Sequence, residues 1–395
     1  MKIVYITRYF WPEANAAATG TLELARRLAN RGHKVSLFVP SSLARHAMVK
    51  QPPLVIPKEL SVSYSGPRLS KFPADTLSFV FLGFRAFRPA CDADVIVAQH
   101  HYGLHWASFC AATLSLATGK PLVIKAHDVF NDLKSILAFV MRWVTWLSFG
   151  QAQQVLVPGE ELVDMVRRVY GLKAGKVGTS LNGVDTTKFS PRHRSDDLRR
   201  RMGSKHIVVF SGSISLSSDA SGLDLLVGAT KLLKRDIPDL KVLIIGDGPD
   251  LQRLIELANS EGLDDSIRFL GWVSPDLIPM YLASADVGVG HLRATIETIG
   301  ATPLKVVEYM ASGCVVVVGR GGVSENLIVD GITGIISESA NVADVAKSIM
   351  RVFSDKKLAA RLRSKARETA EKVYDWEVIV SELEDTLRST AELRK

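Results

Sequence analysis

Two runs of alternating strand and helix patterns dominate the sequence. Short segments rich in β-branched residues, such as "KIVYIT" (2–7), "DVIVAQH" (94–100) and "KVLIIGDG" (241–248), are separated mostly by helical stretches. Strands that are apolar throughout are typical of parallel sheets covered by helices on both faces, because neither face meets water. The alternation restarts at "HIVVFSG" (206–212), so the sequence predicts two doubly wound α/β domains in tandem.

The chain length and one polar segment indicate where the first domain ends and the second begins. At 395 residues the chain is about twice the usual size of a single domain. The polar segment "GVDTTKFSPRHRSDDLRRRMGSK" (183–205) separates the two alternating regions, so we expect it to be the linker. Doubly wound sheets bind ligands at the carboxyl ends of their strands, and two facing domains leave a cleft between those ends.

The stretch "PLKVVEYMASGCVVV" (303–317) places charged residues in an apolar helix that leads into a core strand. Thr302 is a good N-cap and Pro303 suits the first helical position, so 302–305 is expected to be a helix N-terminus that attracts anions. Lys305 adds positive charge there, and Glu308 follows one turn later, where it can accept hydrogen bonds from ribose hydroxyls. Phosphate first and sugar next is the layout of a nucleoside diphosphate. The alternative is a surface Lys–Glu pair at i,i+3.

Positive charge is concentrated in the first half of the sequence. Residues 1–190 carry 22 Lys and Arg against 12 Asp and Glu, whereas residues 191–395 carry 27 against 29. The excess predicts an anionic partner, a membrane surface or a phosphorylated lipid, with ordinary solvated charge as the alternative. Residues 71–88 mix apolar side chains with Lys and Arg, but no apolar run reaches the roughly 18–20 residues that span a bilayer. We therefore expect peripheral contact with an anionic membrane, and no basic-aromatic stripe indicates nucleic acid binding.

Cysteine usage and the first residues indicate the compartment. Cys91, Cys110 and Cys314 show no CxxC spacing, which fits a reducing compartment and argues against a zinc site or a disulfide framework. The start "MKIVYIT" lacks the pattern of a signal peptide. We expect a cytoplasmic protein associated with the inner face of the cell membrane.

An ordered set of segments resembles the retaining GT-B glycosyltransferases, the large family usually numbered four, over nearly the whole chain. The opening at 9–40, "SLNGVDTTKFSP" (180–191), "LIIGDGPDLQRL" (243–254) and the segment from 303 onward are similar, in order, to that family. Within the family, "PLKVVEYMA" resembles the branch that builds surface polysaccharides and lipid-linked glycans. The resemblance implies two Rossmann-like domains facing across a cleft. The acceptor domain would cover 1–185, with the C-terminal helix at about 375–395 packed on it, and the donor domain 186–374, with a hinge at 183–205.

The resemblance implies that the second domain holds a nucleotide sugar. Glu308 matches the family glutamate that binds the ribose, and Trp272 and Val273 match positions that flank the base. Gly246 and Gly248 form only part of a GxGxxG, which fits the GT-B loop better than an NAD site. The expected donor-binding residues are Glu308, Lys305, Leu304, Pro303, Thr302, Ser213, Gly212, Trp272, Val273, Gly246 and Ala17.

The first domain is expected to supply the acceptor side. "NAAATG" (15–20) takes the place of the family's glycine-rich loop near the donor phosphates, and Asn15 is an expected acceptor-binding residue together with His100. His127 ends a strand and matches the family histidine near the scissile bond, and Asp128 follows it; both are expected to be catalytic. For His101 and His105 the alternative of a strand-end core histidine is favoured.

Three positions depart from the family pattern. Gly300 stands where the family carries a first glutamate, and Glu297, the nearest carboxylate, is the expected catalytic substitute. Ser213 and Ser221 replace an Arg and a Lys that contact the diphosphate. Lys305 and the helix N-terminus are expected to substitute for these two cations.

The resemblance implies transfer of a sugar from a nucleoside diphosphate sugar to a hydroxyl of a glycan or lipid-linked acceptor, with retention at the anomeric carbon. It implies front-face attack assisted by the departing diphosphate, no cofactor and no required metal. Two alternatives remain open: a GT-B-type nucleotide-sugar epimerase or hydrolase, and a catalytically degenerate subunit that supports a partner transferase. An NAD-dependent oxidoreductase is a more distant alternative.

Overall fold

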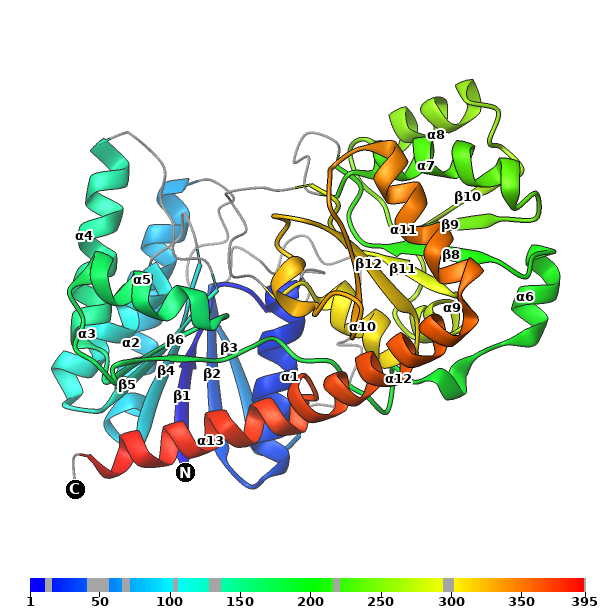
Figure 1. The fold of residues 1–395 in the computed structure, drawn as a ribbon. Helices are drawn as coiled ribbons and strands as arrows, with labels where there is room; N and C mark the ends of the chain where they lie inside the picture. Colours follow the sequence, from blue (N-terminus) through cyan, green and yellow to red (C-terminus); the bar gives the residue numbers. More distant parts are fainter. Residues whose placement is uncertain are drawn as a thin grey trace. The chain divides into compact units, whose positions relative to one another are not determined.

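The computed structural model describes residues 1–10, 16–40, 57–65, 72–101, 106–127, 136–215, 221–293 and 302–393. The chain forms two compact units (Figure 1). The first unit comprises Met1–Asn182 together with Trp376–Lys395, and the second comprises Gly183–Asp375. The chain therefore leaves the first unit, completes the second, and returns to the first for its last helix.

The first unit is built on a parallel sheet of seven strands in the order β3-β2-β1-β4-β5-β6-β7. Its strands are β1 (Lys2–Ile6), β2 (Lys34–Pro40), β3 (Leu60–Ser65), β4 (Val95–His100), β5 (Leu122–Ala126), β6 (Gln154–Val157) and β7 (Val177–Thr179). Its helices are α1 (Ala16–Asn30), α2 (Phe72–Cys91), α3 (Trp106–Thr118), α4 (Ile136–Gln151), α5 (Glu160–Tyr170) and α13 (Trp376–Glu392). Val4 of β1 lies opposite Ser36 on one neighbouring strand and Ile96 on the other.

Successive residues of β1 fill the cores on opposite faces of this sheet, because side chains alternate along a strand. Ile3 and Tyr5 pack into the layer that contains α1 and α13, whereas Val4 and Ile6 pack into the layer that contains α2, α3 and α5. Both faces are thus buried, as the continuous apolar strands predict.

The second unit repeats the plan with a parallel sheet of six strands in the order β10-β9-β8-β11-β12-β13. Its strands are β8 (Ile207–Ser211), β9 (Lys241–Ile245), β10 (Ile267–Gly271), β11 (Val287–Val289), β12 (Val315–Gly319) and β13 (Gly334–Ser337). Its helices are η2 (Pro191–His193), α6 (Asp196–Met202), α7 (Leu223–Asp236), α8 (Leu251–Ser260), α9 (Ile278–Ala283), α10 (Leu304–Ser312), η4 (Glu325–Leu327), α11 (Val342–Ser354) and α12 (Lys356–Val373). The two sheets confirm the predicted class, a pair of Rossmann-like doubly wound units.

Helix α10 approaches its sheet closely because the strand beneath it carries a glycine. A Cβ built on Gly288 of β11 would lie 2.5 Å from the ring of Tyr309, which is fully buried on α10. The Tyr309 hydroxyl also accepts a hydrogen bond from the Ser211 backbone N–H, at 2.7 Å, so α10 is fastened to the end of β8.

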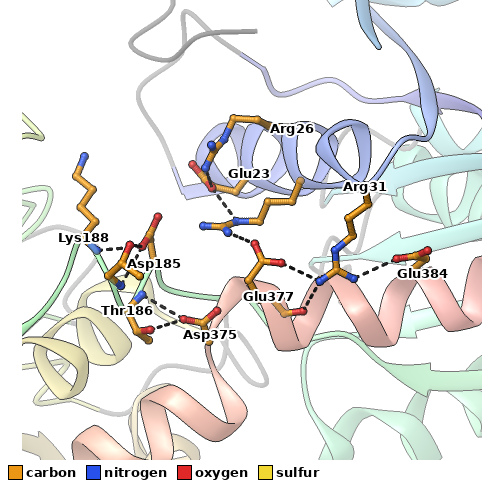
Figure 2. Close-up of polar contacts among 11 residues, drawn as sticks. Glu23, Arg26, Arg31, Asp185, Thr186, Lys188, Asp375, Glu377 and Glu384 are labelled. Carbon is orange, nitrogen blue, oxygen red and sulfur yellow. Dashed lines mark hydrogen bonds and ion pairs between the residues drawn. The ribbon is translucent and has the colours of Figure 1, made fainter. Parts of the chain in front are cut away.

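The final helix is fastened to α1 by ion pairs within the first unit (Figure 2). Arg31 on α1 lies 2.8 Å from Glu377 and 3.1 Å from Glu384, both on α13. Arg27 also pairs with Glu377. In the second unit, Asp375 accepts hydrogen bonds from the backbone N–H (3.3 Å) and hydroxyl of Thr186. Each end of the α12–α13 junction is therefore held by its own unit.

The structure corrects the expected linker and the number of strands. Residues 183–205 are part of the second unit and include α6, where Arg199 pairs with Asp286 at 3.1 Å. Two strands were not expected from the sequence, β3 and β13. Among the described helices, none is long and apolar enough to cross a membrane.

Candidate active site

The strand order of the second unit reverses between β8 and β11, and the carboxyl ends of these two strands form the edge where such sheets bind ligands. Gly212 and Ser213 follow β8, and Gly290 and His291 follow β11. Gly246 follows the neighbouring β9. The sequence thus places small residues beside the reversal point, where a ligand can approach the backbone.

Glycine is required where the loops after β8 and β9 meet. A Cβ on Gly246, whose φ is +136°, would overlap the Gly212 carbonyl oxygen, and one on Gly248 would overlap the Ile214 carbonyl oxygen. The same loops are joined by hydrogen bonds from Gly212 N–H to Ile245 (2.9 Å) and from Ile214 N–H to Asp247 (3.0 Å). The partial GxGxxG of the sequence therefore serves loop-to-loop packing.

Helix α10 starts at this edge one residue later than predicted. Its first helical residue is Leu304, and its N-cap is Pro303, whose ψ of 116° is extended; Thr302, the predicted cap, is buried before the helix. No side chain caps α10, because proline supplies no capping oxygen. The N–H groups of Leu304 and Lys305 belong to the first turn, whose donors have no partner within a helix. Pro303 itself has no N–H to offer.

Lys305 points from the first turn of α10 toward the end of β8. Its Nζ lies 4.3 Å from the centroid of the Phe210 ring, and a Cβ on Gly212 would be 2.9 Å from it. Burial lowers the pKa of Lys305 to about 8, while Glu308 acts in the opposite direction. The ammonium group is therefore a partly desolvated cation beside Gly212, the residue that follows β8.

Glu308 lies half-buried one turn further along α10. Burial raises its pKa to about 7, against the opposing effect of Lys188 and Lys305. Throughout the described part of the chain, the side chains of Lys305 and Glu308 form no ion pair or hydrogen bond with each other or with any other residue. The alternative of a surface Lys–Glu pair is therefore wrong, because the two side chains are not paired with each other.

Two further residues at this edge were missed by sequence reasoning. His291 follows β11, and its Nδ1 lies 2.8 Å from the Ser324 hydroxyl; burial, with Lys305 nearby, lowers its pKa to about 3. Arg293 makes two hydrogen bonds with the Asp224 carboxylate, at 2.8 and 2.6 Å. Their position just after an apolar strand could have identified them as candidate site residues, as it did for His127.

The remaining donor-side residues are spread around the edge. Ser213 is exposed, whereas Ser221 is buried and its hydroxyl has no partner in the described structure. Trp272 follows β10 with 71% of its surface exposed, and Val273 beside it is half-buried. Glu297 and Gly300 lie outside the described residues.

The corresponding edge of the first unit is organised by Gln99, near the end of β4. The Gln99 side-chain oxygen accepts hydrogen bonds from Thr7 at 2.7 Å and Thr21 at 2.9 Å, and its amide nitrogen donates to the Tyr5 hydroxyl at 3.1 Å. His101 lies 3.2 Å from the same oxygen. This buried network joins β1, α1 and β4 at the point where the strand order reverses.

Three histidines occupy the carboxyl ends of β4 and β5. His127 and His101 are stacked, with centroids 4.6 Å apart and an angle of 5° between the rings. Burial, with His101, Lys125 and His100 nearby, lowers the pKa of His127 well below its usual value, and its Nε2 is buried without a partner. His100 is buried on the other side, with Nδ1 2.9 Å from Ser108. The structure thus groups His127 with His101, and His100 points away into the helical layer, where its ring contacts Phe149.

Lys125 on β5 is also buried, and its Nζ donates a hydrogen bond to the Leu181 carbonyl at 3.1 Å; burial lowers its pKa to about 7. Ala17 lies in the first turn of α1, where its carbonyl accepts a hydrogen bond from Thr21 at 2.7 Å. Asn15 and Asp128 lie outside the described residues. Within the described ranges, no three His, Cys, Asp or Glu side chains gather to hold a metal ion.

Comparison with known proteins identifies the class to which these two units belong. The model of Glycosyltransferase Family 4 matches residues 17–188, and that of Glycosyl transferases group 1 matches residues 196–369. The GDP-mannose-dependent alpha-(1-6)-phosphatidylinositol monomannoside mannosyltransferase of Mycobacterium tuberculosis is 29% identical over 407 residues, which cover 98% of each chain. The D-inositol 3-phosphate glycosyltransferase of Geodermatophilus obscurus is 27% identical, over 94% of this chain and 84% of the relative.

Solved structures share the fold. The crystal structure of Anabaena Alr3699/HepE in complex with UDP superposes with a TM-score of 0.75 at 20% identity, over 98% of this chain and 100% of that one. The architecture is therefore that of the GT-B glycosyltransferases. The chain belongs to family 4 of these enzymes, the glycosyl transferases group 1, as the sequence resemblance implies, and it is a glycosyltransferase of GT-B type.

Proposed function

We propose that this glycosyltransferase moves a hexosyl group from a nucleoside diphosphate sugar to a hydroxyl of a lipid-linked or glycan acceptor, with retention at the anomeric carbon. The proposal rests above all on one observation, the unpaired charges of Lys305 and Glu308 on the first turns of α10, at the reversal point of the sheet. Half-buried charges are costly unless a partner satisfies them. A nucleoside diphosphate offers a partner to each.

In this proposal the diphosphate lies at the start of α10. The Lys305 ammonium and the N–H groups of Leu304 and Lys305 would neutralise its charge, because a helix N-terminus favours anions. Glu308 would accept hydrogen bonds from the two ribose hydroxyls. Trp272 and Val273 would flank the base, and Gly212 and Gly246 would leave room for the backbone to approach.

Relatives support the donor and acceptor classes. The mycobacterial relative is described as GDP-mannose-dependent and as acting on a phosphatidylinositol monomannoside, and the Anabaena structure contains UDP. The Geodermatophilus relative is described as acting on inositol 3-phosphate. We infer that the acceptor here is likewise a hydroxyl of a phosphorylated or lipid-linked molecule, at the inner face of the cell membrane.

The proposed chemistry is the front-face attack that the family resemblance implies. The bond between the anomeric carbon and the diphosphate oxygen breaks, and the acceptor oxygen bonds to the same face of that carbon. The acceptor proton passes to an oxygen of the departing diphosphate. Stabilising the growing negative charge on the leaving group is the largest requirement, and Lys305 is placed to meet it. His127, whose uncharged form is favoured by its surroundings, is the proposed hydrogen-bonding group of the first unit in the transfer step. Asp128 and Glu297 remain proposed catalytic carboxylates.

Calorimetry with GDP, UDP and dTDP, each with and without the sugar, tests the donor site. We expect one base series to bind and Glu308→Ala to weaken it by at least roughly 10- to 100-fold, because charge-assisted hydrogen bonds contribute about 1.5–3 kcal/mol. Unchanged affinity in a variant with wild-type circular dichroism would refute the ribose role. Retention is tested separately by following the anomeric proton signals of donor and product by NMR.

Ser213, Ser221 and Gly300 favour one alternative, a degenerate subunit that supports a partner transferase, because the family cations and first glutamate are missing there. Such a subunit would bind no nucleotide in the same calorimetric panel. A nucleotide-sugar epimerase or hydrolase would bind the donor and convert it without any acceptor, which the NMR assay detects.

A further inference from the structure

The outer surface of helices α2, α3 and α4 exposes large apolar side chains to solvent. These helices pack side by side in the order α2, α3, α4 on one face of the first sheet (Figure 1). Phe84 is 79% exposed, Phe139 is 72% exposed and Trp143 is 56% exposed. The exposed apolar side chains, here called the aromatic face, are Val80, Phe81, Phe84 and Phe87 of α2, Leu116 of α3, and Phe139, Val140, Trp143 and Trp146 of α4.

The aromatic face is grooved along both helix–helix contacts. Between α2 and α3 a groove of about 550 Å³ is lined by side chains that include Phe84, Phe87 and Trp106. Between α3 and α4 a second groove of about 370 Å³ is lined by side chains that include Leu116 and Trp146. A continuous apolar surface of this kind marks an interaction site, because scattered single apolar residues would not form grooves.

The charge of these three helices is unlike that of a solvated surface. Together they carry a single carboxylate, Asp75, and three arginines, Arg85, Arg88 and Arg142. Helix α3 carries no charged residue at all. By contrast, α13 of the same unit has Asp or Glu on several turns. The aromatic face therefore combines apolar side chains with arginine and almost no negative charge.

We propose that the aromatic face docks on an anionic bilayer, with its Phe and Trp side chains in the boundary between head groups and acyl chains. Phe, Leu and Trp together with Arg are the side chains that suit this boundary, where each aromatic ring is buried and each guanidinium meets a phosphate. Arg85, Arg88 and Arg142 are all exposed, and their positive charge complements anionic head groups. Interfaces between proteins share this aromatic and arginine-rich composition, so a second copy of the chain is the competing occupant, and the last experiment below tests it. The inference is independent of the donor site proposed above.

Sedimentation with vesicles tests the docking. Full-length protein is mixed with vesicles of phosphatidylcholine alone or of phosphatidylcholine with phosphatidylglycerol. The test variant is Phe84→Glu/Trp143→Glu, and the matched control is Val169→Glu/Val329→Glu, which alters two apolar side chains, 50% and 56% exposed, on other surfaces. We expect wild type and control to bind the anionic vesicles. The affinity of the test variant should be at least roughly tenfold lower, because two apolar side chains that would be buried in the membrane boundary are replaced by charged ones. Equal binding of test and control variants overturns the proposal, as does failure of wild type to bind.

Tryptophan fluorescence locates the insertion. Brominated lipid should quench part of the wild-type emission. Trp106→Phe/Trp143→Phe/Trp146→Phe, which replaces every tryptophan of the face and its grooves among the described residues, should remove that quenching while binding is largely retained. Quenching that persists in this variant places the contact elsewhere and contradicts the assignment. Sedimentation velocity without lipid tests the alternative that the aromatic face binds a second copy of the chain. If wild type is a dimer that Phe84→Glu/Trp143→Glu converts to a monomer, the aromatic face joins two copies of the chain and the membrane assignment fails.

Discussion

Lys305 holds its ammonium group 4.3 Å from the centre of the Phe210 ring and forms no ion pair with Glu308, which lies one turn away on the same helix. The aromatic ring stabilises the cation by only about 0.5–2 kcal/mol. The N–H groups of the ammonium remain able to donate hydrogen bonds to a ligand. In an i,i+3 ion pair, Lys305 and Glu308 would have neutralised each other and left neither charge for a ligand. Their separation keeps one positive and one negative group available at the same edge of the sheet.

Replacement of this cation should distinguish phosphate recognition from base recognition. We expect Lys305→Met to weaken the nucleoside diphosphate by roughly 10- to 100-fold and the bare nucleoside hardly at all, because only the diphosphate carries the charge that Lys305 meets. Calorimetry on both ligands measures the difference. Lys231→Met, which removes a lysine paired with Glu261 elsewhere in the second unit, is the control. Equal weakening of both ligands would show that Lys305 does not contact the phosphates.

The raised pKa of Glu308, about 7 against an ordinary 4.5, should make the protein less stable as the pH rises through that interval. There the folded protein retains a proton that the unfolded chain has lost, so the free energy of unfolding falls with pH. The lowered pKa of Lys305, about 8 against 10.5, acts in the opposite sense, and stability should recover between those values. Urea denaturation across the pH range measures the free energy of unfolding. In Glu308→Gln, the fall of this free energy between about pH 4.5 and 7 should be smaller than in the wild type. The exposed Glu256 of α8 supplies the control, and a Glu256→Gln variant with the same flattening would contradict the assignment.

His127→Ala should lower turnover while donor affinity stays close to that of the wild type, because His127 lies in the first unit, away from α10 in the chain. The two quantities are measured separately, by the rate of transfer at saturating donor and by calorimetry. Thermal unfolding shows whether loss of the stacked ring partner of His101 has damaged the fold. Donor affinity that falls in parallel with turnover would mark His127 as a structural or donor-binding residue.

Gly246→Ala should destabilise the second unit and abolish nucleotide binding, since its Cβ would overlap the Gly212 carbonyl and force the two loops apart. Overpacking of this kind costs about 1–3 kcal/mol in addition to the strain of the backbone conformation. Gly262→Ala is the matched control, because Gly262 also has a positive φ, of +67°, but no atom within 4 Å of the added Cβ. Urea denaturation should show the larger loss for Gly246→Ala. Similar losses would mean that φ alone requires the glycine.

The sequence was sufficient for the main strands, because a continuous apolar strand in a parallel sheet has no other stable environment. "CVVVVG" and "KVLIIGDG" are such strands, and both form where the pattern predicts. Strand β3 lies at the edge of its sheet, and its sequence, LSVSYS, lacks the continuous apolar run of the central strands; its alternation of polar and apolar residues was the signal that could have identified it. The polar composition of 183–205 indicates a linker, yet Leu198 and Met202 are buried on one face of α6.

Local patterns could not settle which side chains meet at the site. The stacking of His101 on His127 joins the ends of two strands, and the Ser324 partner of His291 comes from a distant loop. The predicted Thr302 cap failed because Pro303 has an extended ψ, a choice between two adjacent residues that propensity does not resolve.

Helix α13 has a consequence for how the protein is made. Its buried residues Trp376, Ile379 and Leu383 complete the core that contains Ile3 and Tyr5, so this apolar layer beside β1 stays uncovered until α13 has been synthesised. The second unit, by contrast, is complete in sequence by Asp375. Domains usually fold in the order of synthesis, from the N-terminus onward. Here the order is inverted: the unit begun first is finished last, and premature termination anywhere before α13 leaves its apolar layer open to aggregation.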